Sequence, residues 1–256
     1  MELNRIYNED CLVGMKRIPD KSVDMILADL PYGTTACKWD TIIPFEPLWE
    51  QYERVIKDNG AIVLTASQPF TSALVMSNPK LFKYEWVWDK VKPSTGLHAK
   101  HQPLRQHESV LIFSKRKPPY KPIMTNANDR EETITSSNGE AFGGAKVTRQ
   151  HDNKGKSYPR SILKLSNANQ RGKVHPTQKP VPLMEYLIRT YTNKGETVLD
   201  NCMGSGTTAI ACINTDRQYI GFELDETYHK LSLERIDNHT QQLSMDYVEA
   251  DDIISE

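Results

Sequence analysis

Residues 197–213 read TVLDNCMGSGTTAIACI, and this stretch decides the fold. It begins as a short apolar strand, passes through two glycines and ends in a helical pattern. Because they carry no side chain, Gly204 and Gly206 let the backbone approach a ligand that any Cβ would block. A strand, a glycine-rich turn and a helix in this order predict a binding loop for a nucleotide-type cofactor within a layered α/β fold.

Polar side chains around the turn supply groups that such a cofactor needs. Ser205 and Thr207 can cap the helix and offer hydroxyls. Glu223 follows the next expected strand, and a carboxylate at that place can accept hydrogen bonds from two ribose hydroxyls. The turn lacks the P-loop pattern GxxxxGKS/T, so it offers no lysine to nucleotide phosphates and an NTPase is not expected.

Two classes of cofactor remain open for this loop. Gly204, Gly206 and Ala209 satisfy the looser form of the dinucleotide fingerprint. Asp200 argues the other way, because a carboxylate at the mouth of the loop would repel a pyrophosphate. The same carboxylate suits a ligand that carries an ammonium and a sulfonium, and this balance favours S-adenosylmethionine.

A second motif, DLPY at residues 29–32, follows an apolar strand pattern. An exocyclic amine on a nucleobase is a poor nucleophile, since its lone pair is delocalised into the ring. Asp29 can accept one amine N–H and the Leu30 carbonyl the other, while Pro31 fixes the backbone and Tyr32 can stack on the ring. An ionised Asp29 also stabilises the positive charge that develops on the nitrogen as a methyl group arrives. The sulfonium supplies the leaving group, so this chemistry needs no metal. A base must be rotated out of the duplex to reach such a pocket.

The net charge of −1 hides an uneven distribution. Residues 80–121 hold ten Lys and Arg against three Asp and Glu, and residues 146–179 hold nine against one. Residues 222–256 hold two basic residues and ten acidic ones. The two basic segments favour a polyphosphate partner, and we expect double-stranded DNA.

Cysteine usage and hydropathy indicate a cytoplasmic protein. The four cysteines show no CxxC pair, so neither a structural zinc site nor a disulfide framework is expected. The first residues do not read as a signal peptide, and no apolar run is long enough to span a bilayer. We therefore expect no membrane association.

Strand and helix patterns alternate on both sides of a long, weakly patterned segment. The patterns predict strands at residues 23–28, 61–64, 84–88, 109–113, 198–199 and 219–222, and helices at residues 47–57, 68–77, 182–191, 207–213 and 228–236. The helix at 47–57 is expected to end at Asn59-Gly60. Residues 115–172 are rich in Thr, Asn, Ser and Gly, and so long a stretch is typical of a functional insert. We expect a catalytic domain at 1–114 and 173–256, and a small target-recognition insert at 115–172.

With both motifs in place, the chain resembles the amino-methyltransferases of DNA, specifically the β group. In that group the catalytic motif comes first, a target-recognition region follows and the cofactor motif comes last. DLPY matches the family's (D/N/S)PP(Y/F) motif with leucine in the second place, where only the backbone takes part. Residues 8–12, 107–113 and 175–180 resemble further family segments. The resemblance implies a Rossmann-like class I methyltransferase fold, with a mixed seven-stranded sheet, helices on both faces and a small target-recognition insert.

The resemblance also implies roles for individual residues. The catalytic residues are Asp29, Leu30, Pro31 and Tyr32. The cofactor-binding residues are Asp10, Cys11, Asp29, Thr177, Lys179, Asp200, Cys202, Gly204, Ser205, Gly206, Thr207 and Glu223. Among these, Asp10 is expected to contact the adenine, and Thr177 and Lys179 the methionine carboxylate.

Other residues are candidates from their type and position alone. Candidates for DNA contacts are Trp39, beside the target base, and Lys90, Lys92, Lys100 and Arg105, on phosphates. Two further tryptophans, Trp86 and Trp88, share one face of a strand and are expected in the core.

These features predict a site-specific, S-adenosylmethionine-dependent DNA methyltransferase that modifies N6 of a flipped-out adenine. Asp at position 29 favours adenine, because N4-cytosine members of the family often begin this motif with Ser. N4 of cytosine is the alternative within the family, and a catalytically inactive DNA-binding protein is the alternative of another class. A homodimer and a cognate restriction endonuclease are further candidate partners, and the resemblance implies a protein of a bacterium or of a phage that infects one.

Overall fold

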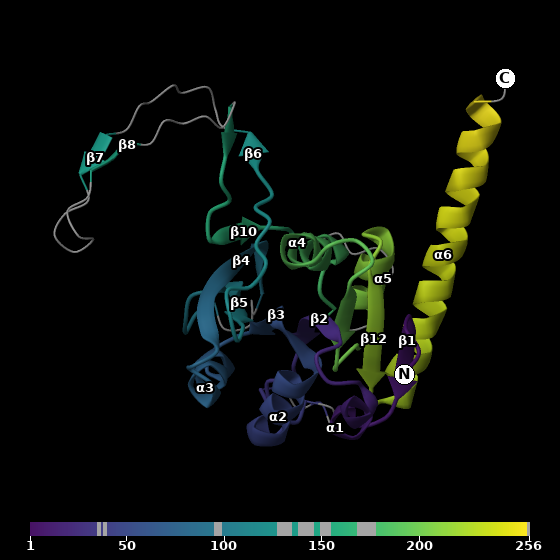
Figure 1. Ribbon diagram of the computed structural model, residues 1–256, viewed down its shortest axis with the longest axis horizontal. Helices are drawn as coiled ribbons and strands as arrows, with labels where there is room; N and C mark the ends of the chain where they lie inside the picture. Colours follow the sequence, from purple (N-terminus) through teal and green to yellow (C-terminus); the bar gives the residue numbers. More distant parts are fainter. Residues whose placement is uncertain are drawn as a thin grey trace. The chain divides into compact units, whose positions relative to one another are not determined.

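A mixed sheet of eight strands organises the main unit of the protein in this computed structural model (Figure 1). The structure describes residues 1–34, 37, 40–94, 99–126, 135–137, 146–148, 155–167 and 178–254. The sheet order is β1-β12-β11-β2-β3-β5-β4-β10. These strands are β1 (Arg5–Asn8), β2 (Val23–Asp29), β3 (Ile56–Ala66), β4 (Phe82–Ser94), β5 (Arg105–Phe113), β10 (Ile162–Lys164), β11 (Thr197–Asp200) and β12 (Gln218–Glu223).

Strand directions divide the sheet into a parallel part and an antiparallel edge. The strands from β1 to β3 in the sheet order are parallel neighbours, whereas β5 runs antiparallel to both β3 and β4. The last strand, β10, pairs parallel with β4. The sheet therefore has one strand more than the seven expected. Neither β1 nor β10 was expected, because each buries a single residue, Ile6 or Leu163.

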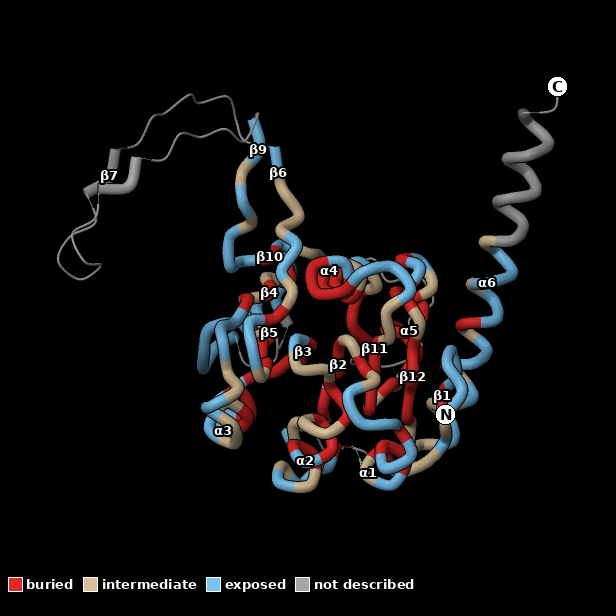
Figure 2. The backbone as a smooth tube through the Cα atoms, in the orientation of Figure 1, coloured by how far each residue is buried: buried red, intermediate tan, exposed pale blue. Residues whose placement is uncertain are grey.

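Helices cover both faces of the sheet. They are α1 (Cys11–Gly14), the 3-10 helix η1 (Met15–Arg17), α2 (Phe45–Val55), α3 (Phe70–Ser77), α4 (Val181–Tyr191), α5 (Thr207–Asn214) and α6 (Glu226–Ile254). Met25 and Val63 face a cluster with α4 and α5, while their neighbours Ile26 and Leu64 face α1, α2 and α3. Because both faces are covered, the central strands are buried along their length (Figure 2).

Helix α6 is longer than its sequence pattern predicts. The pattern covers residues 228–236, but the helix has 29 residues. Within the described parts of the chain, no helix combines the length and the apolar character that crossing a membrane requires.

One expected helix end is wrong. Helix α2 ends at Val55, and β3 begins at the next residue rather than after Asn59-Gly60. Val23 pairs with Ile56 and Met25 with Ala61, so the residues between them on β3 form a bulge. Gly60 is required in this bulge because a Cβ would lie 2.8 Å from the Asp24 carbonyl oxygen.

A second compact unit, Pro122–Arg160, is separate from the main unit, Met1–Lys121 and Ser161–Glu256. It contains two antiparallel pairs, β6 (Thr125–Asn126) with β9 (Lys156–Ser157) and β7 (Thr135–Ser137) with β8 (Lys146–Thr148). The expected insert at 115–172 is wider than this unit, since it includes β10 of the main sheet.

The chain is tied to the main unit where it leaves and where it returns. The Lys121 N–H donates to the Thr190 carbonyl at 2.9 Å. The Ser161 carbonyl accepts from the Val87 N–H at 2.8 Å. The two residues that flank the second unit, Lys121 and Ser161, are therefore held in the main unit by backbone hydrogen bonds.

Candidate functional site

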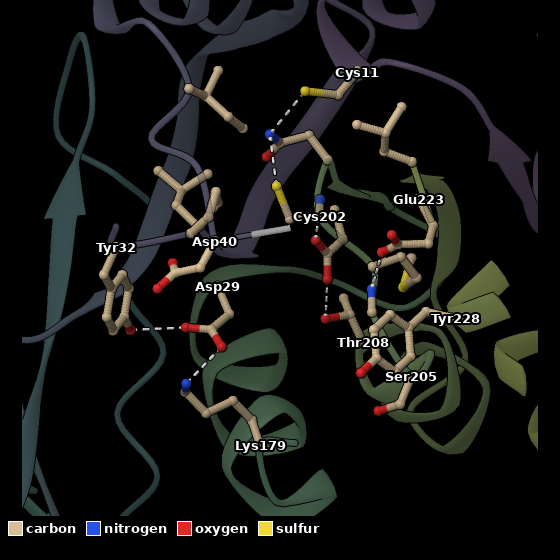
Figure 3. A pocket seen from close by; sticks show the side chains of 18 of the residues that line it. Cys11, Asp29, Tyr32, Asp40, Lys179, Cys202, Ser205, Thr208, Glu223 and Tyr228 are labelled. Atoms are coloured by element: carbon tan, nitrogen blue, oxygen red, sulfur yellow. Dashed lines mark hydrogen bonds and ion pairs between the residues drawn. The ribbon is translucent and has the colours of Figure 1, made fainter. Parts of the chain in front are cut away.

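Three carboxylates stand at the ends of neighbouring parallel strands. Asp29, Asp200 and Glu223 are the last residues of β2, β11 and β12. All three line one cavity of about 820 Å³, together with Gly204 (Figure 3). Ligands of open α/β sheets bind at the carboxyl ends of the strands. The structure thus brings the two sequence motifs into one site.

The glycine turn has the backbone conformation that its sequence requires. Gly204 and Gly206 have φ of +53° and +78°, in the left-handed region that favours glycine. Gly206 immediately precedes α5, and a Cβ there would lie 3.2 Å from the Ser232 Cβ on α6. A side chain at this position would require α6 to shift by a few tenths of an ångström.

Glu223 is fixed by backbone groups of its own site. Its Oε2 accepts the Gly204 N–H at 2.8 Å and its Oε1 accepts the Asp225 N–H at 2.8 Å. Burial raises its pKa above the ordinary value, although these two bonds act in the opposite direction. Each carboxylate oxygen has a further lone pair, so the oriented group can still accept hydroxyl donors such as those of a ribose.

Asp200 accepts hydrogen bonds from two residues of the cofactor loop and of the helix that follows it. Its Oδ2 accepts the Thr208 hydroxyl at 2.6 Å and its Oδ1 accepts the Cys202 N–H at 3.0 Å. Burial raises the pKa of this carboxyl group to about 7, despite both bonds. Its expected contact with a cofactor ammonium stays a prediction.

An arginine on α6 corrects the expected role of two hydroxyls. Ser205 and Thr207 do not cap α5, because Gly206 is the N-cap residue and makes no side-chain cap bond. Instead, the Arg235 Nη1 donates to the Ser205 carbonyl at 2.8 Å and to the Thr207 hydroxyl at 2.9 Å. Both residues still line the cavity. No sequence signal distinguished Arg235 from an exposed helix residue.

Further candidates for cofactor binding lie at the start of α1 and in the turn. Asp10 lines the cavity and caps α1, where its Oδ1 accepts the Leu12 N–H at 2.7 Å. Cys11 and Cys202 also line the cavity, and the Asn201 Nδ2 lies 3.5 Å from each sulfur. These residues line the same cavity as Glu223, and their contacts with a cofactor stay predictions.

The Asp29 carboxylate is bonded on both oxygens. Its Oδ1 accepts the Tyr32 hydroxyl at 2.8 Å and the Thr65 hydroxyl at 2.5 Å. Its Oδ2 forms an ion pair with the Lys179 Nζ at 2.6 Å (Figure 3). Leu30 completes this wall of the cavity. Thr65 lies on β3, beside β2, and was not expected in the site.

The Tyr32 ring is held in place by Phe70. The two rings stack with centroids 5.1 Å apart and an angle of 24° between their planes. Burial, together with the Asp29 charge, raises the pKa of Tyr32 well above its ordinary value, so the hydroxyl stays protonated and donates to Asp29. The ring can offer a target base only the face that Phe70 leaves open.

A row of buried charges of alternating sign continues from Asp29. The Lys179 Nζ lies 3.4 Å from the Glu108 Oε2, and the Glu108 Oε1 accepts from the Lys90 Nζ at 3.1 Å. Burial alone would lower the pKa of Lys179, but the carboxylates of Asp29 and Glu108 raise it. Burial alone would raise the pKa of Glu108, but the two lysines lower it.

This row of charges changes the roles expected for Lys90 and Lys179. Lys90 is 4% exposed and forms part of the cavity wall, so it does not face a DNA backbone as expected. Lys179, expected at the methionine carboxylate, pairs with Asp29. Glu108 was not expected in the site, although a glutamate two residues before the apolar run of residues 110–113 was a signal that could have found it.

The remaining candidates lie outside the cavity or outside the described residues. Lys92, Lys100 and Arg105 are exposed, and their phosphate contacts stay predictions. Trp39 and Thr177 are not among the residues that the structure describes. The two tryptophans expected in the core, Trp86 and Trp88, are buried.

The chain resembles known DNA methylases in sequence. The model of the family N6_N4_Mtase, described as DNA methylase, matches residues 23–234. The DNA adenine methyltransferase YhdJ of Escherichia coli (strain K12) is 30% identical over 256 residues, which cover 92% of this chain and 83% of that protein. The type II methyltransferase M.HpaI of Haemophilus parainfluenzae is 25% identical over 249 residues, which cover 91% of this chain and 74% of that protein.

Solved structures share the fold. The crystal structure of the M1.HpyAVI-SAM complex superimposes with a TM-score of 0.63 and 24% identity over 91% of this chain and 98% of that one. The cytosine-N4-specific PvuII DNA methyltransferase gives a TM-score of 0.64 and 17% identity over 89% of this chain and 84% of that one. The likeness confirms the expected α/β fold, apart from the eighth strand.

Proposed function

Because the chain belongs to the DNA methylase family, we propose that it methylates the N6 amine of adenine within a specific DNA sequence. The observation that carries this proposal is the position of Asp29, which shares one cavity with the glycine turn and Glu223. An acceptor for an amine and an acceptor for ribose hydroxyls thus open into the same space. That space has the size class of small-molecule sites.

The chemistry of the residues fits S-adenosylmethionine. Glu223 offers an oriented carboxylate to the ribose, and Gly204 presents bare backbone beside it, whereas Gly206 packs against α6 and does not line the cavity. When bound, this cofactor supplies a methyl carbon on a positively charged sulfur, which leaves with the electron pair of the carbon–sulfur bond as the amine nitrogen attacks. We propose that the turn and Glu223 hold the cofactor so that this carbon faces Asp29.

Asp29 acts on the amine electrostatically. Its carboxylate accepts one N–H, and the Leu30 carbonyl, whose residue also lines the cavity, accepts the other. The nitrogen gains positive charge as its bond to carbon forms, and the nearby carboxylate stabilises that charge. The methylated nitrogen then releases one proton to water. Tyr32 stays protonated, supports the carboxylate and offers its ring to the base.

Two observations support adenine over cytosine. Position 29 carries Asp, which is typical of adenine-specific members, and YhdJ, a relative at 30% identity, is named a DNA adenine methyltransferase. The PvuII enzyme, which is named cytosine-specific, shares the fold at 17% identity. N4 of cytosine is therefore the second candidate.

Nucleoside analysis separates these candidates. Purified protein is incubated with unmethylated plasmid DNA and S-adenosylmethionine, and the digested DNA is analysed by liquid chromatography and mass spectrometry. N6-methyladenine from wild type and none from Asp29→Ala is the expected result. N4-methylcytosine alone would overturn the choice of base. DNA binding without any methyl transfer would make the chain an inactive DNA-binding protein.

We further propose that residues 115–172 select the DNA sequence. The segment is inserted between the two halves of the catalytic domain, and its second half belongs to a basic stretch of the sequence. Single-molecule sequencing of DNA from cells that express the protein reports the modified base and its sequence together. If a restriction endonuclease of the same specificity is a partner, this DNA will resist it.

A homodimer stays a prediction that sedimentation analysis tests.

A further inference from the structure

The carboxylate that must receive the target amine is already engaged. The Asp29 Oδ1 accepts two hydroxyls, and its Oδ2 lies 2.6 Å from the Lys179 ammonium. A cation at this distance opposes the positive charge that must develop on the amine nitrogen. Methyl transfer therefore requires that the ammonium of Lys179 moves away from Asp29 as the base enters.

The Lys179 side chain is largely shielded from solvent. It is 7% exposed, and a buried ammonium without an anionic partner is strongly disfavoured. The Glu108 Oε2 lies 3.4 Å from the Lys179 Nζ. This oxygen is buried and accepts no well-formed hydrogen bond from the residues that the structure describes. It is an acceptor that the ammonium can bond fully after a short shift.

Glu108 is itself anchored. Its other oxygen, Oε1, accepts from the buried Lys90 at 3.1 Å. When Lys179 shifts from Asp29 to Glu108, Lys179, Glu108 and Lys90 each keep a partner of opposite sign, and Asp29 keeps its hydrogen bonds from two hydroxyls. The incoming amine takes the place at Asp29 that the ammonium has left.

From this geometry we infer that Glu108 is a positioning residue for methyl transfer, which takes over the Lys179 ammonium and frees the Asp29 Oδ2 for the target amine. The inference rests on the proposed function. Glu108 does not touch the reacting atoms, and it acts only through Lys179. Lys90 has the supporting role of holding Glu108 in place.

The Glu108→Gln variant tests this role because it keeps the shape of the side chain and removes its charge. Lys179 is then left with Asp29 as its anionic partner and competes with the amine. The single-turnover rate of methyl transfer should fall by about 10- to 100-fold. The affinity for S-adenosylmethionine, measured by calorimetry, should change by less than about 3-fold, since Glu108 supports the amine side of the site. Glu85→Gln, an exposed carboxylate on the neighbouring strand β4, is the matched control.

A double-mutant cycle with Lys179→Met distinguishes positioning from general structural damage. Without the ammonium there is nothing for Glu108 to draw away, so adding Glu108→Gln should change the rate of Lys179→Met by less than about 3-fold. Glu108→Asp, which retains a carboxylate, should recover part of the lost rate. It also keeps the test decisive if the glutamine variant does not fold.

Two outcomes would overturn the inference. One is a wild-type rate for a folded Glu108→Gln. The other is a Glu108→Gln effect of the same size with and without the Lys179 side chain, because Glu108 would then act by another route. Absence of methyl transfer by the wild-type protein would instead contradict the proposed function.

Discussion

Asp29 and Glu223 end the parallel strands β2 and β12 and line one cavity, with Asp200 on β11 between them (Figure 3). The proposed acceptor for the amine and the proposed acceptor for the ribose therefore belong to different strands. Because each is held by its own hydrogen bonds, the two functions can be removed separately.

Asp29→Asn should remove methyl transfer and leave both ligands bound. The amide cannot stabilise the charge on the nitrogen, so the single-turnover rate should fall by at least about 10²-fold. Affinities for DNA and S-adenosylmethionine should stay within about 3-fold of wild type. Asp58→Asn, at a partly exposed carboxylate paired with Lys21 and remote from the cavity, is the control. A variant that keeps a tenth of the wild-type rate would contradict the assigned role.

Glu223→Gln should weaken cofactor binding instead. Hydrogen bonds to a charged group contribute about 1.5–3 kcal/mol each, so the Kd for S-adenosylmethionine should rise about 10- to 100-fold. Calorimetry measures this change, and DNA affinity without cofactor should be unaffected. Glu226→Gln, three residues along the chain and paired only on the surface with Lys230, should bind like wild type. An unchanged Kd for Glu223→Gln would remove this residue from the cofactor site.

Local sequence was sufficient to predict the residues at the strand ends. Asp29 and the glycine turn each follow an apolar strand directly, and parallel strands that pair bring their ends together. The partners of these residues were not predicted, because they depend on which strands become neighbours. Thr65 bonds Asp29 only because β3 lies beside β2, and Arg235 reaches the turn only because α6 returns to it.

The burial of Lys90 could have been predicted from the sequence. Side chains alternate between the two faces of a strand, so Lys90 shares a face with Trp86 and Trp88. The two tryptophans were expected in the core, and the same alternation predicts that Lys90 is buried with them. A lysine at such a position needs a carboxylate, and Glu108 on the paired strand β5 provides it.

Gly206→Ala should destabilise the protein more than Gly195→Ala does. Both glycines have φ near +79°, where alanine costs about 1–2 kcal/mol. At Gly195 the added Cβ meets nothing within 4 Å, whereas at Gly206 it lies 3.2 Å from the Ser232 Cβ. Urea unfolding should show an additional loss of about 1 kcal/mol for Gly206→Ala. Equal losses would show that α6 yields without strain.

Tyr32→Phe should separate the hydroxyl from the ring. The ring stays stacked on Phe70, but Asp29 loses a hydrogen bond of 2.8 Å. We expect the rate of methyl transfer to fall by about 10- to 100-fold, as for one bond to a charged group, and Tyr32→Ala to lower it further. Rapid-quench measurement with saturating DNA and cofactor provides the rates. An equal loss in both variants would leave no role for the ring.

The buried Asp200 should make stability depend on pH in a defined direction. Its pKa is about 7 in the folded protein, whereas the unfolded chain releases this proton near pH 4. The contribution of Asp200 to stability is therefore complete below pH 4 and is lost as the pH rises to 7. From pH 5 to pH 8, the free energy of unfolding of wild type should decrease relative to that of Asp200→Asn in urea titrations without cofactor. A constant difference would show that the carboxyl group ionises normally.

Lys121 and Ser161 give the chain fixed exit and return points on the main unit. Changes of length or sequence between these points leave the register of the sheet and the reacting groups as they are. With the proposed role of this segment in sequence selection, we expect new DNA specificities to arise by exchange of one continuous gene segment, without the loss of activity that redesign around Asp29 would bring. The same boundaries suit chimeras in which the segment of one relative replaces that of another.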